Sequence, residues 1–127
     1  MLTESLAMYT EMMLYKENYG EAAMKKQLEI HKQIYQSEKG LYKEQPLYKV
    51  TPENTHISYS KGAIVIVKLS EEIGEQQLNK ILKCFLAKYR YPQRPTTLNF
   101  LDELNIAMNP EEYKRIIWLI CWCVMKY

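Results

Sequence analysis

The stretch GAIVIVKL, residues 62–69, decides whether this chain is all-α or mixed. Its four consecutive β-branched residues, at positions 64–67, are typical of a buried strand. The segments on either side carry helical periodicity, however, and the sequence shows no second strand with which this one could pair. We therefore predict a fully buried helix over residues 62–69 and an all-α fold.

Downstream of this stretch, the sequence predicts a strongly amphipathic helix that begins after Gly74. Apolar residues recur there every three or four positions, as on the buried face of a helix. They are Leu78, Ile81, Leu82, Phe85, Leu86 and Tyr89. Pro92 and Pro95 follow, and proline ends or breaks a helix, so we place the end of this helix before them.

Two shorter helices are predicted beyond the prolines from their capping residues. Thr96 or Thr97 can accept the first free backbone N–H groups of a helix that carries Phe100 and Leu104. The run NPEE at residues 109–112 places an amide at the N-cap, Pro at the first helical position and Glu at the third, which is a capping-box pattern.

Upstream, residues 2–35 predict two helices separated by Gly20. In the first, Leu2, Leu6, Tyr9 and Met13 form the predicted buried stripe, with Met8 and Met12 beside it. In the second, the predicted stripe is Met24, Leu28, His31 and Tyr35. A break of one or two residues makes the pair a hairpin or a sharp corner. Residues 37–55 lose the periodicity and contain Gly40, Pro46 and Pro52, so we expect an irregular connection. The prediction is an array of about six helices.

The composition is that of an ordinary folded domain. The chain has 127 residues, 47% of them hydrophobic, with four Gly and five Pro, which excludes disordered and low-complexity classes. Lys and Arg number 17 against 15 Asp and Glu, a net charge of +2, without the basic stripe that neutralises nucleic-acid phosphates. We expect one helical unit over residues 1–127, either a small domain or part of a larger one, and no nucleic-acid partner.

The cysteines and the apolar end of the chain point to no secreted or membrane-spanning class. Cys84, Cys121 and Cys123 cannot all pair with one another, so we expect free thiols. The apolar run over residues 116–125 contains ten residues, about half of what a bilayer span requires. We predict a buried terminal helix there and no membrane contact by this chain.

Taken one by one, the polar residues have ordinary explanations. Glu4 is explained as a surface acid in the first turn of a helix, where it suits the helix dipole. His31 and His56 are each explained as hydrogen-bonded core or surface histidines. The eleven tyrosines are explained as core and rim aromatics. The sequence contains no Gly-rich phosphate loop, CxxC pair or nucleophile elbow.

The order and spacing of four short motifs change this interpretation. LTES at residues 2–5 is followed by YSKGA at residues 59–63, so that Tyr59 lies 55 positions after Glu4. IG at residues 73–74 and TLNFL at residues 97–101 come behind them. Over residues 2–105 this arrangement resembles the zinc aminopeptidases of the gluzincin type, to which alanyl aminopeptidase N and puromycin-sensitive aminopeptidase belong. It looks most like a bacterial subgroup joined to membrane permease segments.

The resemblance implies a fold and two site residues. The chain would be the helical lobe of a thermolysin-like catalytic domain. Glu4 would be the third zinc ligand, since a carboxylate oxygen is a good zinc ligand. Tyr59 would be catalytic, its phenol stabilising the tetrahedral intermediate of peptide hydrolysis by zinc-activated water. Gly62 and Ala63 behind it would allow close packing.

The sequence departs from the family because it lacks HExxH, which supplies the other two zinc ligands and the general base. We therefore expect a fragment of a metallopeptidase, an aminopeptidase by resemblance, that is inactive alone and binds no zinc tightly. Its partners would be a peptide substrate and the remainder of the catalytic domain, with self-association as a substitute. The alternative is a non-catalytic helical interaction module derived from the same fold. The parent's location stays open, with membrane association expected for a permease-linked protein.

Overall fold

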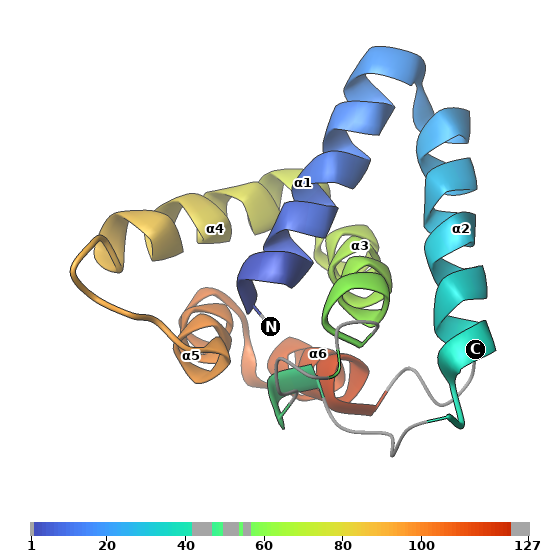
Figure 1. The fold of residues 1–127 in the computed structure, drawn as a ribbon. Coiled ribbons are helices and arrows are strands. Elements are labelled where there is room, and N and C mark those ends of the chain that lie inside the picture. Colours follow the sequence, from blue (N-terminus) through green and yellow to red (C-terminus); the bar gives the residue numbers. More distant parts are fainter. Residues whose placement is uncertain (1, 42–46, 50–53, 55–56, 123–127) are drawn as a thin grey trace.

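The computed structural model describes residues 2–41, 47–49, 54 and 57–122 and confirms the all-α prediction. Within these residues the chain forms six α-helices, one 3₁₀ turn and one π-helical turn, and no β-strand (Figure 1). In chain order the elements are α1 (Leu2–Tyr19), α2 (Glu21–Glu38), η1 (Leu47–Lys49), η2 (Ile57–Lys61), α3 (Gly62–Ile73), α4 (Glu75–Lys88), α5 (Thr97–Ala107) and α6 (Pro110–Trp122).

Helices α1 and α2 form a hairpin that turns at Gly20, and α3 contacts both of its legs (Figure 1). Gly20 has φ +89°, a left-handed conformation that glycine adopts without steric cost. The predicted stripe of α2 is confirmed at Met24, Leu28 and Tyr35, which are buried. On α1 the buried residues are Ser5, Tyr9 and Met12. Tyr9 of the predicted stripe is therefore buried, whereas Leu2, Leu6 and Met13 are half-buried, and the sequence did not predict the burial of Ser5.

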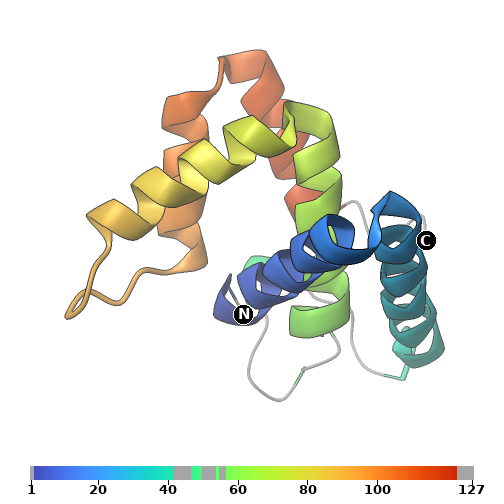
Figure 2. The same cartoon turned by 90° about the horizontal axis from the view of Figure 1, so that it is seen from above.

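Helix α3 lies at the centre of the molecule and contacts α1, α2, α4 and α6. In Figure 2 the α1–α2 hairpin and the α5–α6 pair lie on different sides of it. Its buried apolar residues are Ala63, Ile64, Val65, Ile66, Val67 and Leu69. The β-branched run is therefore helical, as predicted, because a helix surrounded by partners on every side buries the same residues that would suit a strand.

The last two helices begin where their capping residues predicted, and α4 begins directly after Gly74, as predicted. Phe85 of α4 meets Phe100 of α5 edge-on, with ring centroids 5.6 Å apart. Thr96 caps α5 through a capping box with Asn99, whose Oδ1 accepts a hydrogen bond from the Thr96 backbone N–H at 2.8 Å. At α6 the backbone N–H of Glu112 donates to Asn109 Oδ1 at 2.9 Å.

Some sequence predictions fall on residues outside the described ranges. The connection predicted over residues 37–55 begins later than expected, since α2 continues to Glu38, and Pro46 and Pro52 lie outside the described residues. His56 and Cys123 lie outside them as well. Cys84 is exposed and is a free cysteine. Among the described helices, none combines the length and the apolar character that crossing a membrane requires.

Candidate functional site

Glu4 lies in the first turn of α1, next to the buried Ser5. Its Oε2 atom is buried and has no hydrogen-bond partner among the described residues, although the side chain as a whole does interact with its surroundings. A hydrogen bond with the amino terminus of the chain, followed by one from the backbone N–H of Glu4 itself, lowers the pKa of this carboxyl below its ordinary value of 4.5. The site therefore favours a carboxylate, which is the form that can bind a cation.

The first turns of α1 and α3 pack against each other at Ser5 and Gly62 (Figure 1). A Cβ atom on Gly62 would lie 2.2 Å from Ser5 Oγ, 2.7 Å from Ser5 Cβ and 3.0 Å from Ser5 Cα. Ser5 is 1% exposed, so its side chain has little space into which to move. The close packing predicted behind Tyr59 is thus present at Gly62, and it brings the LTES and YSKGA motifs into contact.

Tyr59 lies on η2, a single π-helical turn that leads directly into α3. Its side chain is 41% exposed, while Ser60 and Lys61 after it are each 3% exposed. The turn contacts both α1 and α2. A phenol that is accessible on a turn anchored by buried neighbours can donate a hydrogen bond to a bound molecule, and single π-helical turns occur often at functional sites.

A contact that sequence reasoning missed joins α2 to this turn. His31 Nδ1 lies 3.4 Å from Ser60 Oγ, and His31 Nε2 is buried with no hydrogen-bond partner among the described residues. The sequence offered one signal, a histidine on the apolar stripe of α2, but that pattern alone indicated an ordinary core histidine. Ser60 is 29 positions away, so nothing local could have identified the partner.

Glu4 fits a zinc site only as one ligand of several, with the others supplied from elsewhere. A catalytic zinc ion takes three protein ligands and leaves a position open. Within the described part of the chain, no group of three or more His, Cys, Asp or Glu side chains could hold a metal ion. Glu4 offers a carboxylate, a suitable oxygen ligand, but the other ligands would have to come from residues that are not described here or not in this chain.

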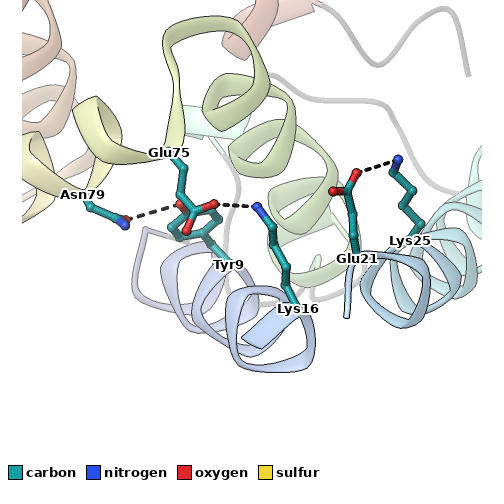
Figure 3. A network of polar contacts seen from close by, with 6 residues as sticks. All are labelled: Tyr9, Lys16, Glu21, Lys25, Glu75 and Asn79. Atoms are coloured by element: carbon teal, nitrogen blue, oxygen red, sulfur yellow. Dashed lines mark hydrogen bonds and ion pairs between the residues drawn. The ribbon is translucent and has the colours of Figure 1, made fainter. Parts of the chain in front are cut away.

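The middle and the last turn of α1 are held by polar contacts to α4 (Figure 3). Tyr9 Oη donates to Asn79 Oδ1 at 3.3 Å, and Lys16 Nζ lies 2.7 Å from Glu75 Oε2. Burial raises the pKa of the Tyr9 phenol, and a hydrogen bond with Ser70 of α3 opposes that rise. The hydrogen bond to Glu75 raises the pKa of Lys16. These contacts fix the orientation of α1, and thereby the placement of Glu4, relative to α4.

Comparison with known proteins identifies the family of the chain. Neither the curated proteins nor the solved structures that were compared with it gave a significant match. Residues 1–121 match the model of the peptidase family M1 domain. This range of the chain includes its LTES motif at residues 2–5 and its YSKGA motif at residues 59–63. The match covers nearly the whole chain, and the protein therefore belongs to peptidase family M1.

Proposed function

We propose that this chain supplies the helical half of the catalytic domain of a zinc-dependent aminopeptidase. Membership of peptidase family M1 supports the metallopeptidase class. The observation that carries the proposal is the contact between Ser5 and Gly62, because it joins the helix end that bears Glu4 to the turn that leads on from Tyr59. Two residues that lie 55 positions apart in the sequence thereby belong to one region of the fold.

In this proposal Glu4 is a metal ligand and Tyr59 is a catalytic residue. A glutamate side chain is a negatively charged carboxylate at neutral pH, the form in which it can bind zinc. The phenol of Tyr59 donates a hydrogen bond to the oxygen that gains negative charge as the peptide bond is attacked, and so favours the transition state over the planar peptide. Zinc, when bound, supplies Lewis-acid activation of the peptide carbonyl and of water.

The complete site needs residues beyond those of this chain. The sequence has no HExxH, and the described residues hold no group of three metal ligands. We therefore expect the 127-residue chain to show no aminopeptidase turnover by itself, and we expect its partner to be the remainder of the catalytic domain. The motifs favour a longer protein of the bacterial subgroup in which the peptidase domain is joined to membrane permease segments.

The coding sequence upstream of Met1 provides the first test. We expect it to encode HExxH before Glu4. If it does, Tyr59→Phe in the longer protein should reduce kcat for an aminoacyl-nitroanilide by about 100-fold, the typical effect of removing one oxyanion donor, with zinc content unchanged. An unchanged kcat would reject the role of Tyr59. An upstream sequence without HExxH would instead favour the alternative, a non-catalytic helical interaction module of the same fold.

A further inference from the structure

The two ring nitrogens of His31 differ in their hydrogen bonding, and the proposed function does not explain this difference. One ring nitrogen, Nδ1, meets Ser60 Oγ at 3.4 Å, while the other, Nε2, is buried and has no hydrogen-bond partner among the described residues. In either neutral tautomer one ring nitrogen donates and the other accepts, so the structure satisfies only one of the two. A buried polar atom without a partner destabilises the fold, and its retention calls for a reason other than stability.

The position of Ser60 suggests the reason. Ser60 is 3% exposed and lies on η2 directly after Tyr59, and η2 packs against α2. Directly after the turn, Gly62 at the start of α3 packs against Ser5 of α1. A π-helical turn is a short and intrinsically poor conformation, so it depends on outside contacts to hold its residues in place.

We propose that His31 is a positioning residue, whose Nδ1 atom holds Ser60 and thereby fixes the turn that presents Tyr59. The functional meaning of this role rests on the proposed function, since it assumes that Tyr59 acts on a substrate. The structural part does not: His31 orders the turn whether or not the chain takes part in peptide hydrolysis. Replacing His31 should therefore reduce the order of this turn without reducing the stability of the whole fold, although the two usually change together.

Three substitutions at one position distinguish a specific hydrogen bond from general packing. His31→Asn places an amide where Nδ1 lies and can keep the contact with Ser60. His31→Gln places its amide nearer to Nε2 and loses that contact, although it is also polar. His31→Leu removes both polar atoms, so the unpartnered Nε2 disappears along with the contact. Ser60→Ala removes the same contact from the other side.

The experiment uses the 127-residue chain labelled with 3-fluorotyrosine and measured by ¹⁹F NMR, with the Tyr59 resonance assigned through Tyr59→Phe. His31→Leu, His31→Gln and Ser60→Ala should each broaden or shift that resonance and raise amide exchange over residues 57–61 at least tenfold, whereas His31→Asn should stay close to the original chain. The melting temperature of His31→Leu should be unchanged or higher. Lys25→Gln, on the exposed side of α2, is the matched control and should change nothing at Tyr59.

Two results would overturn the inference. One is an unaltered Tyr59 resonance in both His31→Leu and Ser60→Ala. The other is a loss of order in His31→Asn equal to that in His31→Gln, which would reduce the role of His31 to packing. If His31→Leu does not fold, Ser60→Ala and the Asn–Gln pair decide the question alone. None of these measurements requires zinc or turnover, so an unchanged kcat of Tyr59→Phe in the longer protein would reject the proposed role of Tyr59 and leave this result standing.

Discussion

The first turn of α1 and the rest of this helix are held in different ways. The middle and the last turn of α1 are fixed to α4 by separate polar contacts, Tyr9 with Asn79 and Lys16 with Glu75. Its first turn is fixed to α3 by a steric fit between Ser5 and Gly62 that leaves no space for a methyl group. Polar contacts at a surface can be lost one at a time at small cost, whereas a close-packed contact between two backbones fails as a whole. The end that carries Glu4 is therefore the more sensitive one.

Gly62→Ala should be the most damaging single change in this comparison. The new Cβ would overlap the Ser5 side chain and press on its backbone, and overpacking of this kind costs about 1–3 kcal/mol. Helix propensity alone predicts the opposite sign, a gain of roughly 0.5–1 kcal/mol for Ala over Gly in a helix. The free energy of unfolding in urea measures which effect wins.

A second substitution identifies the cause. The cost of Gly62→Ala should shrink in a Ser5→Gly background, because that change removes Ser5 Oγ and Cβ, the two atoms nearest to the new methyl group. An equal cost in both backgrounds, or a Gly62→Ala variant as stable as the original chain, would show that the two helices do not depend on this fit.

In the middle of α1, Tyr9→Phe should have an intermediate effect. The substitution keeps the ring of Tyr9, a residue that is 3% exposed, and removes the hydrogen bonds of its phenol with Asn79 and Ser70. One hydrogen bond of this type contributes about 0.5–1.5 kcal/mol. Asn79→Ala removes only the first of these bonds, from its exposed partner, and should cost less. A loss for Tyr9→Phe well above that of two such bonds would mean that this polar part of α1 is as intolerant as the close-packed first turn.

The smallest effect is expected for Lys16→Met. The side chains of Lys16 and Glu75 are 38% and 40% exposed, and surface pairs of this kind contribute at most about 1 kcal/mol. The pKa of Lys16 is raised in the fold, so its contribution is fully present below the ordinary lysine pKa of 10.5 and is lost as pH rises through the folded value. The difference in unfolding free energy between the original chain and Lys16→Met should accordingly shrink above pH 10.5 and in high salt. A difference independent of both would point to packing of the lysine stem.

The sequence predicted the parts of the fold that depend on local signals. Gly20, Thr96 and Asn109 act through their own backbone or the next turn, so their helix boundaries could be placed without tertiary information. These helix boundaries need only residues that lie close together in the chain. The buried helix α3 was predictable in a different way, because no second strand was found anywhere in the sequence with which it could pair.

The contacts that build the site were harder to predict. The buried face of α1 includes Ser5, a small polar residue that a search for hydrophobic periodicity passes over. Ser5 is buried because the backbone of Gly62 approaches it, and that approach depends on how two helices cross. The contact between His31 and Ser60 likewise joins distant segments. Glu4 and Tyr59 were proposed from the resemblance to the zinc aminopeptidases, and the spacing of their motifs carried no geometry.

Zinc content of the Glu4→Gln variant tests the role of this site most directly. The measurement uses the protein encoded together with its upstream sequence, with metal determined by plasma emission after dialysis. Glu17→Gln, an exposed substitution on the same helix, is the matched control. We predict one zinc ion per chain in the original protein and in the control, and loss of most of the zinc together with aminopeptidase turnover in Glu4→Gln. A Glu4→Gln variant that keeps its zinc and its turnover would contradict the assignment of Glu4 as a metal ligand.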